Sequence, residues 1–149
     1  MKIESVKLIL DTCAEAGRLE ALLPPLPAGI TPRCVRVIEQ IAYLSGQREQ
    51  VRVSDISAML DVTRPGITAV LNVLTEDGYV TKERDPADSR NVYVSLTERG
   101  WQLYRTYVSD YHQHLTEVLA GIGDDGAQRL AESIHRILSL ISEDTQTNA

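Results

Sequence analysis

Two neighbouring groups of polar and cationic side chains have the chemistry to bind a polyanion. The first lies between Thr63 and Asn72, in a stretch without a carboxylate until Glu76. A threonine hydroxyl can donate to a phosphate, and an asparagine amide can pair with an adenine edge, which gives ~1–3 kcal/mol of base discrimination. The second contains Arg84 and Arg90, whose guanidinium groups suit phosphates or a narrow minor groove. The candidate contacts to double-stranded DNA are Thr63, Arg64, Pro65, Gly66, Thr68, Asn72, Arg84, Asp88 and Arg90.

A helix is expected to carry the first group. After Thr63 the apolar residues recur at i, i+3, i+4 and i+7, which places them on one buried stripe of Ile67, Val70, Leu71 and Leu74. The opposite face is small and polar, with Pro65, Thr68, Ala69 and Asn72. A shorter helix capped by Ser54 precedes it, connected through Asp61 and Val62, and its inward residues are Ile56, Met59 and Leu60. Two short helices joined in this way predict a helix-turn-helix.

A β-hairpin is expected to carry the second group. Gly78 is suited to end the preceding helix, and the residues from Tyr79 to Arg84 then alternate in hydropathy. Alternation returns over residues 92–96, after a polar turn. Residues 51–53 form a short apolar segment that could add a third strand to the pair. A hairpin directly after a helix-turn-helix predicts the wing of a winged helix.

The segment from Ser54 to Gly100 resembles the MarR family of bacterial and archaeal transcription regulators. The wing of that family characteristically reads D-x-R, a strand and then L-T-x-x-G, and the matching residues here are Asp88, Arg90, Leu96, Thr97 and Gly100. The resemblance implies a homodimeric winged helix-turn-helix protein, mainly α with a small β-wing, that represses or activates transcription. It also implies release from DNA by a small ligand or by thiol oxidation. Within the wing, the Asp88 carboxylate can hold Arg90 in one orientation.

The composition is that of an ordinary globular protein of 149 residues with a net charge of −6. A homodimer would carry −12, twice the −6 of one chain, so DNA would be attracted only by a local positive surface. No apolar run approaches the roughly 18 to 20 residues of a membrane span, and no signal-peptide pattern precedes the first helix. We therefore expect a cytoplasmic protein without a membrane partner, and no residue pattern calls for a cofactor.

The segments that flank the winged helix read as helices. The first covers residues 5–23, from Ser5 to Leu23, and the next begins at Thr31 and Pro32, a strong start signal, and runs to about Ser45. A long helix is expected from Thr97 to about Ala120. The last helix, capped by Asp124 or Asp125, carries one apolar stripe of Ala127, Leu130, Ala131, Ile134, Ile137, Leu138 and Ile141.

The apolar stripe of the last helix has no further chain to cover it. We therefore interpret residues 1–149 as a single domain, with a winged helix-turn-helix DNA-binding lobe at 31–100. Residues 1–30 and 101–149 are expected to form a helical dimerisation region that intertwines with a second copy. The alternative is one closed monomeric core.

Four tyrosines are candidates for an effector site. The resemblance places a ligand crevice between the dimerisation helices and the DNA-binding lobe. The side chains there that could stack on or hydrogen-bond a small aromatic or phenolic ligand are Tyr43, Tyr104, Tyr107 and Tyr111. The alternative is that these tyrosines are ordinary core or dimer packing.

The two cysteines, Cys13 and Cys34, fall in helical segments without a C-x-x-C spacing. Two buried thiols in a reducing compartment are the simpler interpretation. The sharper alternative is a redox site at Cys13, because some members of the resembled family switch through a cysteine of the N-terminal helix. The charges beside Cys13 are acidic and do not favour a thiolate.

A metal site or an enzyme finds little support in the residue spacing. His112 and His114 lie at i and i+2 on a helix and point in different directions, so one of them would need Cys34 or a distant glutamate to complete a site. No Gly-rich phosphate loop, nucleophile elbow or H-E-x-x-H motif occurs, so no metal and no catalytic residue are predicted. A winged helix used only as a protein-interaction module is the remaining alternative.

Overall fold

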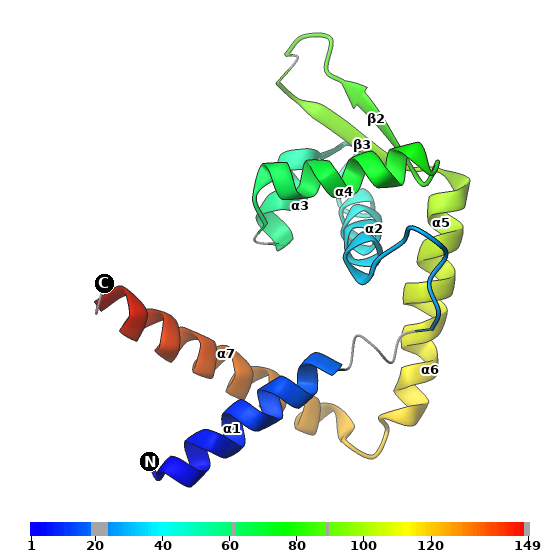
Figure 1. Ribbon diagram of the computed structural model, residues 1–149. Helices are drawn as coiled ribbons and strands as arrows, with labels where there is room; N and C mark the ends of the chain where they lie inside the picture. The colour runs from blue at the N-terminus through cyan, green and yellow to red at the C-terminus, as the bar shows by residue number, and fades with distance from the viewer. Residues whose placement is uncertain (19–23, 61, 89, 148–149) are drawn as a thin grey trace. The chain divides into compact units, whose positions relative to one another are not determined.

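The computed structural model describes residues 1–18, 24–60, 62–88 and 90–147 (Figure 1). The chain separates into two compact units, Met1–Tyr111 and His112–Ala149. The first unit contains α1 (Ile3–Ala16), α2 (Pro32–Ser45), β1 (Val51–Arg52), α3 (Val53–Leu60), α4 (Arg64–Glu76), β2 (Val80–Arg84), β3 (Val92–Leu96), α5 (Glu98–Tyr104) and a π-helical turn (Arg105–Ser109). Helix α6 (Asp110–Val118) follows the turn, and α7 (Gly123–Thr147) lies in the second unit.

The three strands form an antiparallel sheet in the order β1-β3-β2, as the hydropathy alternation predicted. In the hairpin, Val80 faces Leu96 and Arg84 faces Val92. The third strand is β1, which pairs Val51 with Val94. The sheet and the helices before it make a mainly α fold with a small β-wing, which confirms the predicted fold class.

Helix α2 forms the centre of the core. Its start is fixed locally, because the Thr31 hydroxyl accepts from the Cys34 amide at 3.3 Å and Pro32 occupies the first helical position. Figure 1 shows α4 between α2 and the hairpin, in agreement with the contacts between these elements. The largest fully buried side chains come from all of them: Val37, Ile38, Ile41, Leu44, Ile56, Ile67, Leu71, Leu74, Val80 and Val94.

Helices α3 and α4 form the predicted helix-turn-helix. The stripe of α4 is buried as expected at Ile67, Leu71 and Leu74, and Gly78 ends the helix at a φ of 73°. Two details of α3 differ from the prediction. The helix begins at Val53 rather than after Ser54, and the Asp55 carboxylate accepts from the Arg52 amide at 3.0 Å. Met59, expected inside, is 51% exposed, whereas Ile56 is buried and Leu60 packs against the core as predicted. Asp61, part of the predicted connection, lies outside the described residues.

The long helix expected from Thr97 to Ala120 is interrupted by the π-helical turn. Thr97 caps α5 as predicted, because its hydroxyl accepts from the Gly100 amide at 3.1 Å. Helix α5 contacts α2 and β3, so it closes the core beside the sheet. The wider π-helical turn then changes which residues share a face beyond Tyr104, which 3.6-residue periodicity cannot anticipate.

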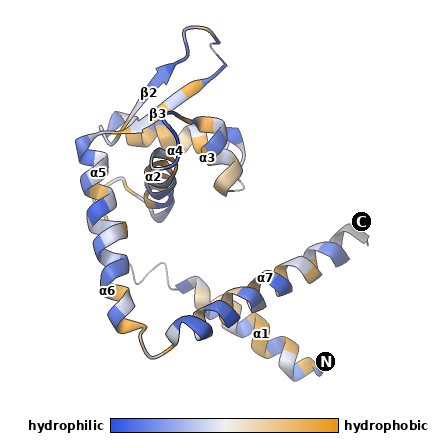
Figure 2. Ribbon diagram, turned by 180° about the vertical axis from the view of Figure 1, so that it is seen from behind, coloured by the Kyte–Doolittle hydropathy of each residue, from blue (hydrophilic) through white to orange (hydrophobic). Residues whose placement is uncertain are grey.

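The terminal helices differ in length from the predicted ones. Helix α1 ends at Ala16, and residues 19–23 of the predicted first helix, including Leu23, lie outside the described residues. Helix α7 begins at Gly123, which has a φ of 68°, so Asp124 and Asp125 lie inside its first turn rather than at its cap. Hydrophobic positions recur along α1 and α7 (Figure 2). No helix within the described ranges combines the length and hydropathy needed to cross a bilayer.

Candidate nucleic-acid interface

A hollow of about 470 Å³ lies between α4 and the hairpin, and we call it the cationic hollow. Residues from β1, α3, α4 and the hairpin line it: Arg52, Val53, Ser54, Arg64, Thr68, Leu71, Asn72, Lys82, Arg84, Arg90, Asn91 and Val92. The hollow therefore joins the two groups of polar side chains that the sequence placed on separate elements.

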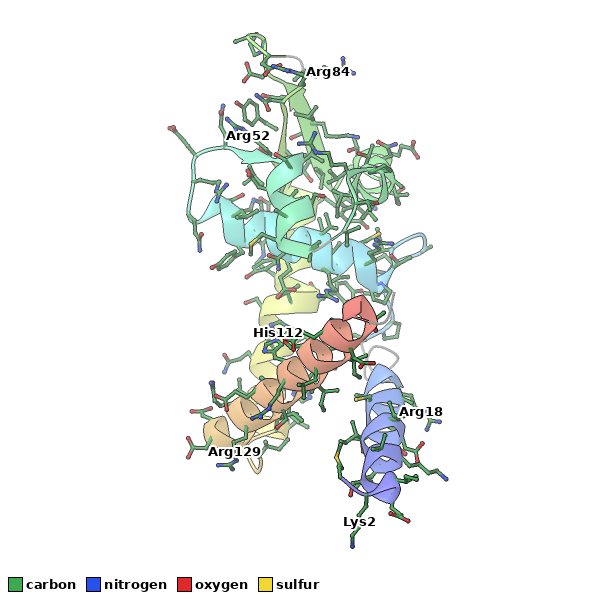
Figure 3. The ribbon with its side chains drawn as sticks, turned by 90° about the vertical axis from the view of Figure 1, so that its left-hand side faces the viewer. Lys2, Arg18, Arg52, Arg84, His112 and Arg129 are labelled. Carbon is green, nitrogen blue, oxygen red and sulfur yellow. The ribbon has the colours of Figure 1, made fainter. Side chains whose placement is uncertain are left out.

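The hollow is positively charged although the chain is acidic. Its described lining includes five cationic side chains and no carboxylate, within a chain whose net charge is −6. Two of the five are labelled in Figure 3, Arg84 on the hairpin and Arg52 on the neighbouring strand. The guanidinium carbon of Arg52 lies 5.9 Å from the centre of the Tyr93 ring, over its face, in a cation–π contact. The arrangement supplies the local positive surface that an acidic protein needs in order to approach a polyanion.

The periods of the helix and the strand bring the lining residues together. Arg64, Thr68 and Asn72 are spaced i, i+4 and i+8 on α4, so they form one row along its exposed face. Lys82 and Arg84 are two residues apart on β2 and therefore project from the same face of the sheet. The row on the helix and the pair on the strand thus form opposite walls of the hollow.

Asn72, on the α4 wall of the hollow, contacts Lys82 on the β2 wall. The Lys82 ammonium donates to the Asn72 Oδ1 at 2.6 Å, and this hydrogen bond links α4 directly to β2. Asn72 is exposed and Lys82 is half-buried. The amide at the C-terminal end of the helix row is therefore held in one orientation rather than being free in solvent.

At the tip of the hairpin, Arg90 is oriented by Asp88, as predicted. Its Nε and Nη2 donate to the two carboxylate oxygens of Asp88 at 2.9 and 3.1 Å. The backbone amide of Arg90 also donates to Asp88 at 3.1 Å. These hydrogen bonds, the side-chain one above all, lower the pKa of Asp88 and raise the pKa of Arg90. The Arg90 side chain is nevertheless 88% exposed, so the pair presents the guanidinium group outward.

Asp85, the second acidic residue of the turn, is used internally. Its carboxylate accepts from the Ala87 amide at 2.8 Å and from the Tyr93 hydroxyl at 2.9 Å. The hydrogen bond from the Ala87 amide is the main reason why the pKa of Asp85 is lowered. Both carboxylates near the tip therefore shape the turn.

The structure places five of the nine predicted DNA contacts in the lining of the hollow: Arg64, Thr68, Asn72, Arg84 and Arg90. Thr63 instead caps α4, because its hydroxyl accepts from the Gly66 amide at 3.4 Å. Pro65 has no N–H, so the first turn of α4 has fewer free amides for a phosphate than its position suggests. A Cβ on Gly66 would lie 3.0 Å from the Val62 side chain, so this glycine allows close packing at the helix start.

Sequence reasoning missed four polar residues of the hollow, Arg52, Ser54, Lys82 and Asn91. Lys82 could have been found, because strand alternation places it on the same face as Arg84. Arg52 could have been found only by pairing the third strand with the hairpin in the correct register, which sets Arg52 opposite Tyr93.

The four candidate ligand tyrosines lie in different surroundings. Tyr107 lines a second hollow of about 270 Å³ beside α5, together with Pro27, Tyr79, Arg99, Gln102, Leu103 and Thr106. The Tyr107 hydroxyl donates to the Pro25 carbonyl at 3.1 Å. Tyr104 packs edge-on against Trp101 with 5.8 Å between ring centres. Tyr43 is 53% exposed, and Tyr111 is half-buried.

The cysteines and histidines are not assembled into a metal site. Cys13 is exposed, whereas Cys34 is buried and its Sγ lies 3.3 Å from the Thr31 hydroxyl. His112 and His114 are both exposed on α6. Across the part of the chain that the structure describes, no three His, Cys, Asp or Glu side chains form a group that could hold a metal ion.

Comparison with known sequences gives the same assignment as the wing motif. A family model described as the MarR family matches residues 28–91. An uncharacterised HTH-type transcriptional regulator of Mycobacterium leprae (strain TN) is 32% identical over 82 residues, which cover 55% of this chain and 57% of that protein. The matched parts of the first curated relatives amount to 64% and 57% of their own length.

Solved structures share the fold over nearly the whole chain. The PcaV transcriptional regulator of Streptomyces coelicolor, solved with its natural ligand, is 18% identical with a TM-score of 0.67, over 88% of this chain and 89% of that one. FabT of Streptococcus pneumoniae, solved in complex with DNA, is 19% identical with a TM-score of 0.62, over 94% of each chain. The family match covers residues 28–91 of the winged helix and the shared fold extends beyond it, so this chain is similar to the transcription regulators of the MarR family.

Proposed function

We propose that the protein is a transcription regulator that binds a pseudo-palindromic DNA operator as a homodimer. The cationic hollow is the observation that carries this proposal, because it joins the exposed row of α4 to the arginines of the hairpin. In each protomer, α4 enters the major groove and the tip of the hairpin follows the adjacent minor groove. Thr63, Pro65, Gly66 and Asp88 shape these elements, while the lining side chains make the contacts.

The charge distribution supports a specific rather than a nonspecific DNA-binding protein. The remainder of an acidic chain repels DNA, so attraction is confined to the five cations of the hollow. Each phosphate that a cation neutralises adds about 0.9 to the slope of log K against log salt. Binding is therefore steeply salt-dependent, and nonspecific DNA competes weakly.

Exposed apolar residues on the terminal helices support the homodimer. Leu130, Ile134, Leu138 and Ile141 form a stripe on α7 and are 40–58% exposed in the single chain. Helix α1 likewise exposes Ile3, Val6, Leu8 and Leu10. A second copy would bury both sets, so residues 1–30 and 101–149 act as the dimerisation region. The two α4 helices then lie one turn of DNA apart, about 34 Å.

The expected direction of regulation is repression, because a dimer on two successive major grooves covers a promoter segment that polymerase must occupy. A small aromatic or phenolic effector would bind beside Tyr107 and its neighbours and release the DNA. The relative solved with its natural ligand supports this part of the proposal. Such an effector binds more tightly to a dimer whose two α4 helices have the wrong separation for the operator than to one with the right separation. It lowers the DNA affinity by that difference in binding free energy and no more.

Selection from a pool of random duplex DNA at two salt concentrations tests the proposal. The dimer should enrich a palindrome whose half-sites are one turn apart, and the enrichment should weaken at the higher salt. Arg84→Ala should reduce binding, whereas Arg129→Ala, which removes the same charge from α7, should not. A folded dimer that enriches no sequence at either salt would instead favour a protein-interaction module.

The same DNA then tests the effector and its redox alternative. Release by a phenolic acid, and loss of that release in Tyr107→Phe, would support the ligand site. Exposed Cys13 is the residue for the alternative, in which peroxide releases the DNA and Cys13→Ser abolishes the response.

A further inference from the structure

The hydrogen bond between Lys82 and Asn72 fixes which atoms of the asparagine face outward. An ammonium group has only donors, so the amide atom 2.6 Å from it must be the carbonyl oxygen. The partner alone thus distinguishes the amide oxygen of Asn72 from its nitrogen. The NH₂ group of Asn72, which lines the hollow together with Lys82, is not engaged by this hydrogen bond.

The surroundings favour this arrangement. Arg64, Arg84 and Arg90 line the same hollow as Lys82, and the described lining contains no carboxylate that could draw the ammonium elsewhere. The positive charges repel the ammonium, whereas the Asn72 oxygen attracts it. Lys82 is also half-buried and sits in the ladder opposite Val94, so its stem has limited freedom.

Held in this way, the two side chains present mainly donors, because the Asn72 oxygen already accepts from the Lys82 ammonium. A free asparagine pairs with adenine by accepting from N6 and donating to N7. In this site one lone pair of the Asn72 oxygen is already engaged, and the ammonium beside it would meet the adenine N6 donor unfavourably. Guanine offers two acceptors, N7 and O6, at the same edge of the major groove. The amide NH₂ and the ammonium together match those two acceptors.

We propose that Lys82 is a specificity-determining residue, and that Lys82 with Asn72 selects guanine where Asn72 alone would select adenine. The inference rests on the proposed function as a DNA-binding regulator. It assigns a base-reading role to a residue of β2, the strand that packs beside α4, rather than to α4 alone.

The test is selection from random duplex DNA with the unmodified chain and four variants. Asn72→Ala identifies the position that the pair reads, because the base preference there should disappear. The unmodified protein should select guanine at that position. Lys82→Met should lower the preference for guanine over adenine roughly tenfold, the scale of one base contact. Lys82→Arg keeps an all-donor side chain and should retain guanine.

Arg84→Met is the matched control, because it removes one charge from the same face of the same strand. It should weaken binding to all sequences and leave the base preference at the Asn72 position unchanged. The melting temperature of each variant establishes that it is folded.

Three outcomes would overturn the inference. Adenine selected by the unmodified protein at the Asn72 position would refute the donor pair, as would identical preferences in the unmodified protein and Lys82→Met. In both cases an enriched palindrome would leave the proposed function standing. Failure of the unmodified protein to enrich any sequence would remove the proposed function, and the inference with it.

Discussion

Asp88 and Arg90 form a closed pair at the tip of the wing. Both oxygens of one carboxylate accept from one guanidinium group, at 2.9 and 3.1 Å, and the Arg90 backbone amide adds a third hydrogen bond at 3.1 Å. The two residues are separated by one position in the chain, so the pair fixes the turn and the arginine at once. The D-x-R motif of the wing is thereby explained as a positioning device.

The Asp88–Arg90 pair should break at low pH, when the Asp88 carboxylate is protonated. The pKa of Asp88 lies below its ordinary value of 3.8, mainly because of the Arg90 side chain. The ionised form of Asp88 is favoured in the folded wing. The pair therefore orders the turn fully at a pH above the ordinary pKa of an aspartate, and this ordering is lost as the pH falls through the lowered pKa of Asp88. An NMR titration of the Asp88 carboxyl should have its midpoint below 3.8. A midpoint at or above that value would mean that the pair does not persist in solution.

Arg90→Ala should weaken binding to most DNA sequences alike. The side chain is exposed and directed outward by Asp88, which suits a phosphate or the minor groove rather than one base edge. The slope of log K against log salt should become shallower by about 0.9 for each phosphate that the variant no longer neutralises. Binding titrations at four salt concentrations measure this change, with Arg129→Ala as the control. A change of preference at one central base pair would contradict the role assigned to Arg90.

Asp88→Ala should have a milder effect of the same kind, because it leaves the charge of Arg90 in place but frees its orientation. Its DNA affinity should fall while the salt slope stays near that of the unmodified protein. An unchanged affinity would show that orientation by Asp88 is unnecessary, whatever the effect of Arg90→Ala.

Most of the winged helix could be predicted because its signals are local. The caps at Thr31 and Thr97, the stop at Gly78 and the stripe of α4 each depend on residues within two turns of one another. The contact of Lys82 with Asn72 could not be predicted in the same way. It joins a helix to a strand, and its geometry depends on how the hairpin packs on α4. The exposure of Met59 and the π-helical turn likewise do not follow from 3.6-residue periodicity.

Gly100→Ala should destabilise the fold. A Cβ at this position would lie 2.1 Å from the Tyr79 carbonyl oxygen, which accepts from the Thr97 amide at 3.1 Å. Backbone must therefore move between α5 and the start of the hairpin, and the cost should be at least the ~1–3 kcal/mol of an overpacked core. Thermal unfolding measures the effect. Gly121→Ala is the control, because its Cβ would meet nothing within 4 Å. Equal melting temperatures for the two variants would contradict the close approach.

Ile134→Glu should separate the proposed homodimer. Ile134 is 40% exposed in the single chain and lies in the apolar stripe of α7. If a second copy covers that stripe, the substitution buries an unpaired carboxylate at the interface, which is far more costly than leaving it in solvent. The mass from light scattering should fall towards that of one chain, 16.5 kDa. Operator affinity should fall with it, because one lobe reads only one half-site. His135→Glu adds a carboxylate at the adjacent exposed position, outside the stripe, and should remain dimeric. A dimer that persists in Ile134→Glu would place the interface on another surface.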